Sequence, residues 1–234
     1  MLDNWHTVNK LLASDLQVFT LDQRSHGRSP HSPDFNYQIM AEDVHDFLKQ
    51  QGIASCYLMG HSMGGKTAMQ VALNYPELIE KLIVIDIAPR AYSSLHDPIL
   101  DALNSVDLGN YKSRQDIDHT LARRIPELPV RQFLMKNLAR NEDGTFRWKM
   151  NLPVITANYH EVLRKVSSDM PYDKPTFVMR STKSSYIVDA DLDDFRRLFP
   201  KYIVANFDTG HWVHAEAPDQ LAKTVIAFLS RSDS

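Results

Sequence analysis

Short apolar runs alternate with amphipathic stretches along much of this 234-residue chain. Each run is apolar almost throughout, which is typical of parallel strands that helices cover on both faces, whereas the stretches between them repeat their apolar residues at helical spacing. This alternation predicts a doubly wound, mostly parallel sheet of the α/β class. The predicted strands are residues 16–21, 56–59, 82–85, 176–179 and 202–205, and the predicted helices around them are 37–48, 67–75, 191–199 and 218–229.

The alternation stops between residues 89 and 171. This stretch contains several helical patterns and no convincing strand of the main sheet, and Ser113 and Asp116 form a capping-box pattern at the start of one helix. We therefore predict an α/β core formed by residues 1–88 and 172–234. A helical cap, residues 89–171, is expected to be inserted between two strands of the sheet.

The charge balance narrows the range of partners. The formal net charge is -3 and the sequence pI is about 6.3, which gives no indication of a nucleic-acid or anionic-membrane partner. No apolar run approaches the ~18 residues that span a bilayer, and the first residues lack the basic and apolar regions of a secretory signal. We expect a soluble, cytoplasmic protein that acts on a small molecule.

Gly60, Ser62 and Gly64 form the pattern Gly-x-Ser-x-Gly between a predicted strand and a predicted helix. A serine on such a tight turn exposes its hydroxyl at the carboxyl end of the sheet, and small neighbours allow the strand and the helix to approach each other. The same turn directs the N–H of Met63 toward a developing oxyanion. We therefore predict Ser62 as a nucleophile and Met63 as an oxyanion-hole donor.

A serine hydroxyl is a poor nucleophile unless a base takes its proton. His211 follows the last predicted strand and precedes the last helix, so it returns to the edge of the sheet where Ser62 lies. Gly210 gives its loop the freedom to project the imidazole, which makes His211 the predicted base. His214 is the alternative, and His61 is expected to point away from Ser62 and to pack against neighbouring loops.

The base needs a carboxylate that holds its tautomer and stabilises the imidazolium. Asp86 directly follows the strand at 82–85, one strand beyond the nucleophile. The segment after the next strand offers no carboxylate before Asp189, which lies at the expected start of a helix, where the helix dipole favours acids. We predict Asp86 as the acid and keep Asp189 as the alternative.

Four stretches resemble the α/β-hydrolase superfamily, and more narrowly its compact branch of esterases and thioesterases. They are LDQRSHGRS (21–29), GHSMGGK (60–66), LIVIDIAP (82–89) and GHWVHAEAP (210–218), and the resemblance covers essentially the whole chain. It implies the α/β-hydrolase fold and the order nucleophile, acid, histidine. It also implies that the aspartate of IDIAP, which is Asp86, is the acid of the triad.

The chain departs from this family at its beginning. Family members have two or three strands before the helix that begins near Asn4, and the loop after the last of these strands donates a second oxyanion N–H through a His-Gly motif. Here the chain begins at Met1, so we expect an N-terminally short fold that lacks this donor. An upstream start, a shortened form with little activity, and a donor from a partner chain or a rearranged loop all remain open. Apolar surface left by the absent strands is expected to favour self-association.

These residues predict a serine hydrolase of carboxylic esters or thioesters that works through an acyl-enzyme, with no cofactor and no metal. A C–C bond hydrolase or a lyase of similar fold is an alternative within the enzymes. A catalytically impaired scaffold, which lacks the N-terminal oxyanion loop, is the alternative outside them.

Overall fold

The computed structural model describes residues 1–94 and 97–231, so residues 95–96 of the predicted cap and 232–234 of the predicted core lie outside the described residues. The chain divides into two compact units. The first comprises Met1–Leu21, Asn36–Ala91 and Arg164–Ser234, and the second comprises Asp22–Phe35 and Tyr92–Leu163. The second unit thus includes residues 22–35 in addition to most of the stretch predicted as a cap.

A parallel sheet with the strand order β1-β2-β5-β6 forms the centre of the first unit. Its strands are β1 (Cys56–His61), β2 (Ile79–Ile85), β5 (Thr176–Ser181) and β6 (Tyr202–Phe207). The two middle strands are buried along nearly their whole length, as their apolar runs predict. The register pairs the last residue of β1 with the last residue of β2, so the carboxyl ends of the strands meet at one edge. The predicted α/β class with a parallel sheet is confirmed.

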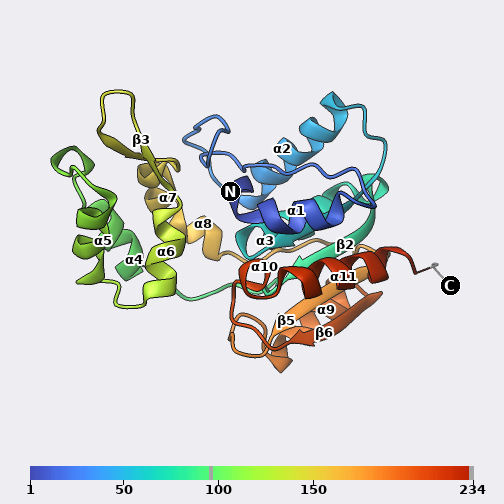
Figure 1. Ribbon diagram of the computed structural model, residues 1–234. Helices are drawn as coiled ribbons and strands as arrows, with labels where there is room; N and C mark the ends of the chain where they lie inside the picture. The colour runs from blue at the N-terminus through green and yellow to red at the C-terminus, as the bar shows by residue number, and fades with distance from the viewer. Residues whose placement is uncertain (95–96, 232–234) are drawn as a thin grey trace. The chain divides into compact units, whose positions relative to one another are not determined.

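Helices cover both faces of this sheet. On one face, α1 (His6–Leu12) and α11 (Pro218–Leu229) lie beside each other and pack in one cluster with Ile83 of β2 (Figure 1). On the other face, α3 (Met63–Asn74) packs against β1 and β2, and α2 (Tyr37–Gln50) packs against α3. Because α3 begins directly after β1, the turn between them lies at the carboxyl edge of the sheet.

Short helices connect the larger elements of the first unit. They are η1 (Leu2–Trp5), η2 (Pro76–Leu78), η4 (Asp189–Asp191), α9 (Leu192–Leu198) and α10 (Val213–Glu216). Within the part of the chain that the structure describes, no helix combines the length and the apolar character needed to cross a membrane.

Residues 16–21 do not form the predicted strand. Residues 17–21 have no regular secondary structure, and no strand within residues 1–94 and 97–231 pairs with them. Val18 still packs against the core cluster, whereas Phe19 and Leu21 are exposed. The prediction was wrong because a strand needs a neighbour that accepts and donates its backbone hydrogen bonds, and an apolar composition does not provide one.

In the described residues of the second unit, residues 22–35 form turns and irregular chain, and the rest consists mostly of short helices and one small hairpin. Ser113 accepts a hydrogen bond from the N–H of Asp116, as the capping pattern predicts. In the hairpin, β3 (Leu138–Arg140) pairs antiparallel with β4 (Phe146–Trp148), apart from the main sheet. A separate apolar cluster holds these elements together. The helices are α4 (Asp97–Asn104), η3 (Leu108–Asn110), α5 (Arg114–Ala122), α6 (Leu128–Met135), α7 (Leu152–Ala157) and α8 (Tyr159–Leu163).

Candidate active site

Ser62 occupies the turn between β1 and α3 in a strained backbone conformation. Its φ is 54° and its ψ is -126°, a combination that residues with a side chain rarely adopt. A Cβ on Gly60 would lie 2.1 Å from the carbonyl oxygen of Gly64, and a Cβ on Gly65 would lie 2.5 Å from Cγ2 of Ile87. The glycines are therefore required for the close approach of strand and helix, which is the geometry of a nucleophile turn.

Hydrogen bonds join this turn to the end of β2. The N–H of Ser62 donates to the carbonyl of Ile85 over 3.1 Å, and the carbonyl of Ser62 accepts from the N–H groups of Gly65 and Lys66. Met63 is the first residue of α3, where N–H groups have no carbonyl partner within the helix. The positive end of the helix dipole lies at the same place. This arrangement suits the Met63 N–H to bind an oxyanion.

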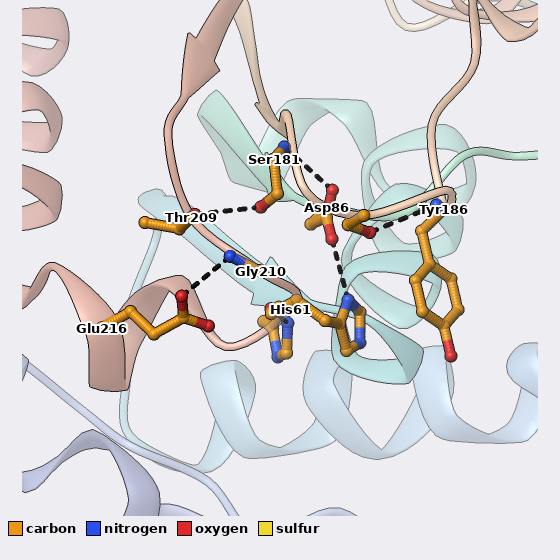
Figure 2. Close-up of polar contacts among 9 residues, drawn as sticks. His61, Asp86, Ser181, Tyr186, Thr209, Gly210 and Glu216 are labelled. Carbon is orange, nitrogen blue, oxygen red and sulfur yellow. Dashed lines mark hydrogen bonds and ion pairs between the residues drawn. The ribbon is translucent and has the colours of Figure 1, made fainter. Parts of the chain in front are cut away.

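Asp86 follows β2 directly and has a buried carboxylate. One oxygen accepts a hydrogen bond from the backbone N–H of Ser181 over 3.0 Å, and the other lies 2.8 Å from Nδ1 of His211 (Figure 2). A carboxylate only accepts hydrogen bonds, so Nδ1 of His211 carries a proton, and in the neutral imidazole the lone pair is then on Nε2. The pair thus presents the imidazole in the tautomer that a general base requires.

Asp189, the alternative acid, lies elsewhere. Its side chain is 87% exposed and forms an ion pair with Arg180, whereas the side chain of Asp86 is fully buried. Of the two carboxylates left open by the sequence, the structure brings only Asp86 into contact with His211.

Several contacts hold the loop that carries His211. The N–H of Gly210 donates to Oε2 of Glu216 over 2.8 Å, and the hydroxyl of Thr209 donates to the hydroxyl of Ser181 over 3.3 Å (Figure 2). Sequence reasoning missed Glu216. An acid six residues after a glycine in a short loop is a weak signal, since many such acids are solvated.

His214, the alternative base, is buried in α10. Its ring stacks on Trp5 with the ring centres 5.2 Å apart and lies 5.1 Å from the ring of His61. The structure thus places it among aromatic rings, while His211 holds the contact with Asp86.

His61 packs against the loop of His211, as predicted. Its Nε2 donates to the backbone carbonyl of His211 over 2.7 Å, and the two ring centres are 4.5 Å apart. Burial, with a further contribution from His211, lowers the pKa of His61 well below 6.5. His61 is therefore neutral near pH 7, and its ring supports the loop without placing a positive charge beside His211.

Tyr186 covers the imidazole ring of His211. Its ring stacks on the His211 ring with the centres 4.0 Å apart and an angle of 21° between the planes. Burial, together with the charge of Asp86, raises the pKa of the Tyr186 hydroxyl, so the phenol stays protonated. Tyr186 was not predicted, because an aromatic residue in this segment has no sequence pattern that indicates the ring it stacks on.

These residues form a nucleophile turn, a buried acid and an oriented imidazole at one edge of one unit. Groups arranged in this way can take a proton from a hydroxyl and stabilise the charge that develops on a carbonyl oxygen. Among residues 1–94 and 97–231, no three histidine, cysteine, aspartate or glutamate side chains are grouped in a way that could hold a metal ion.

Comparisons with known proteins show the family to which this chain is similar. A family model described as alpha/beta hydrolase fold matches residues 1–218. The sn-1-specific diacylglycerol lipase ABHD11 of Danio rerio is 36% identical to this chain, over 97% of this chain and 74% of its own length. Esterase YbfF of Escherichia coli (strain K12) is 33% identical, over 98% of this chain and 89% of its own length. The solved structure of a marine microorganism esterase is similar with a TM-score of 0.94 at 38% identity, and the match covers 97% of this chain and 90% of that chain.

Proposed function

Given that this chain belongs to the α/β-hydrolase family, we propose that it hydrolyses carboxylic esters or thioesters of small acyl compounds through a triad of Ser62, His211 and Asp86. The relatives named esterase and lipase support an ester hydrolase. The observation that carries the proposal is the 2.8 Å contact between the buried Asp86 and His211, at the same sheet edge as the strained turn of Ser62.

The proposed reaction has two halves. In the first, Oγ of Ser62 attacks the carbonyl carbon of the substrate while Nε2 of His211 takes the hydroxyl proton. Asp86 stabilises the imidazolium, and the Met63 N–H binds the oxyanion. The imidazolium then gives its proton to the leaving alcohol or thiol, which leaves an acyl-enzyme on Ser62. In the second half, water attacks the acyl carbon with His211 again as base, and the acid leaves.

The second unit is proposed to act as a cap that selects the substrate. Its chain leaves the first unit after Ala91, five residues beyond Asp86, and returns at Arg164, shortly before β5. An insertion at the carboxyl edge of the sheet is where substrate-selecting segments of open α/β folds are found. The dependence of KM on acyl length, measured with p-nitrophenyl esters, would identify the preferred acyl group.

Labelling with a fluorophosphonate probe tests the proposed triad. We expect the wild-type protein to be labelled, and labelling to be lost in Ser62→Ala and strongly reduced in His211→Ala. Ser14→Ala, which removes an exposed serine hydroxyl, is the matched control and should label fully. Folded wild-type protein that remains unlabelled would instead favour a non-catalytic scaffold, so circular dichroism of each variant accompanies the assay.

We also propose self-association through β1, which ends the strand order of the described sheet. Tyr57 on this strand is 42% exposed, and a strand at the end of a sheet presents backbone groups to which another chain can pair. Light scattering should show a mass that rises with concentration, and Tyr57→Lys should shift it toward the monomer. A constant monomer mass for the wild-type protein would contradict this proposal.

A further inference from the structure

Arg90 lies four residues beyond Asp86 and contacts two different parts of the first unit. Its backbone carbonyl accepts a hydrogen bond from Nζ of Lys66 over 2.8 Å. Lys66 is the fourth residue of α3, the helix that begins directly after Ser62. The buried ammonium of Lys66 also donates to the carbonyl of Arg164. The main chain at Arg90 is thereby tied to the helix of the nucleophile.

The side chain of Arg90 contacts a buried carboxylate. Its Nε lies 2.8 Å from Oδ1 of Asp191, whose side chain is only 3% exposed. The other oxygen of Asp191 accepts a hydrogen bond from the backbone N–H of Val188 over 2.8 Å. Val188 lies two residues after Tyr186, so Asp191 holds the end of the segment from which the tyrosine ring reaches His211.

A buried carboxylate depends on its cation. Removing one member of a buried ion pair leaves the other charge buried without a partner. The folded protein is then far less stable than with the intact pair. Without Arg90, the carboxylate of Asp191 is expected to turn toward water and to release the Val188 N–H. The segment would then loosen, and Tyr186 would no longer be held against the imidazole of His211.

From these contacts we propose that Arg90 is a positioning residue for the hydrolysis, acting through Asp191 and Tyr186 on the orientation of His211. This inference rests on the proposed function, because it assigns His211 the role of base. Arg90 touches none of the three residues of the triad in the contacts described above. Its effect on the reaction is therefore indirect, and it should act on turnover more than on substrate binding.

A double-mutant cycle tests this proposal with p-nitrophenyl butyrate as the substrate. Arg90→Ala and Tyr186→Leu should each lower kcat about 10-fold, with KM changed less than about twofold, because a misplaced base slows the chemical step. If Arg90 acts through Tyr186, the variant with both substitutions should lose about 10-fold as well. If the two residues acted independently, their effects would multiply, and the kcat of the double variant would fall about 100-fold.

Two rescue variants separate positioning from a general loss of structure. Arg90→Lys keeps a cation beside Asp191 and should recover most of kcat. Adding Asp191→Asn to Arg90→Ala removes the buried charge and leaves an amide oxygen that can accept from Val188, so it should recover part of kcat. Arg196→Ala, which breaks an exposed arginine–aspartate pair in α9, is the matched control and should leave kcat unchanged.

Three results would overturn the proposal: losses that multiply, a change confined to KM, or an Arg90→Ala protein as active as the wild type. If Arg90→Ala does not fold, two other variants still test the proposal. Arg90→Lys must stay active, and Tyr186→Leu must lose kcat. An inactive and unlabelled wild-type protein would instead contradict the proposed function itself. The two failures are therefore distinguishable.

Discussion

The ends of β1 and β2 differ from the segment that follows β5, although all three meet at the same edge of the sheet. At the first two, Ser62 and Asp86 have positive φ values of 54° and 47°, and the carboxylate of Asp86 is fully buried between two hydrogen-bond donors. After β5, Asp189 is largely exposed and pairs with Arg180 at the surface. Backbone strain and a buried charge occur together only in the first of these two regions, and that combination is typical of functional sites.

The largest expected effect is the loss of the buried acid. Asp86→Asn keeps the size of the side chain but removes the charge that orients and stabilises the imidazolium, so kcat should fall about 10⁴-fold. Steady-state kinetics with p-nitrophenyl butyrate would measure it. A loss of less than 10-fold would mean that another group serves as the acid. The ends of β1 and β2 would then no longer differ in function from the segment after β5.

The next effect is on the turn at the end of β1. Gly60→Ala places a Cβ 2.1 Å from the backbone oxygen of Gly64, and the main chain must move to accept it. The free energy of unfolding should decrease by about 3 kcal/mol, in the upper range for overpacking. Urea unfolding would measure this change.

Gly52→Ala is the matched control for that variant. Gly52 has a φ of +67°, and a Cβ added to it would meet open space, so alanine there costs only the left-handed conformation, about 1 kcal/mol. Equal losses at the two glycines would show that backbone conformation, and not the close approach of strand and helix, determines the cost at Gly60.

A third prediction concerns pH. The pKa of His61 is lowered in the folded state by burial, so the unfolded chain binds more protons below pH 6.5. The contribution of neutral His61 to the free energy of unfolding is fully present above pH 6.5. It is lost as the pH falls toward the pKa of His61 in the folded protein. His61→Gln has no proton to gain and can still donate to the carbonyl of His211. Between pH 6.5 and 5, the wild type should therefore lose stability more steeply, by up to about 1.4 kcal/mol per pH unit.

Urea unfolding of both proteins at several pH values would measure this difference. His26 is also buried, with its pKa lowered by burial to about 4, but it titrates equally in both proteins and cancels. Parallel pH profiles for the two proteins would show that His61 is protonated in the fold, against the interpretation of His61 as a neutral support for the loop.

The smallest effect is expected after β5. Asp189→Asn breaks an ion pair in which the aspartate itself is largely exposed, and such pairs contribute about 0–1 kcal/mol. The kcat of this variant should stay within about twofold of the wild type. A loss comparable to that of Asp86→Asn would place the catalytic acid in this segment.

Sequence reasoning predicted best where neighbours in the chain determine the geometry. The tight turn of Ser62 depends on Gly60 and Gly65, which lie within three residues of it. It failed at residues 16–21, because a strand also requires a partner that lies elsewhere in the chain. It also missed Tyr186, since an aromatic residue in a loop carries no pattern that reveals what it stacks on.

The sequence by itself determined the α/β class of this protein and the turn that presents Ser62, because apolar periodicity and glycine sterics act over a few residues. Only the tertiary structure decided between the two candidate acids. Asp86 meets the N–H of Ser181 and the ring of His211, which lie 95 and 125 residues away in the chain. Burial and hydrogen bonding depend on which strands become neighbours, and these long-range contacts form only when the sheet is assembled.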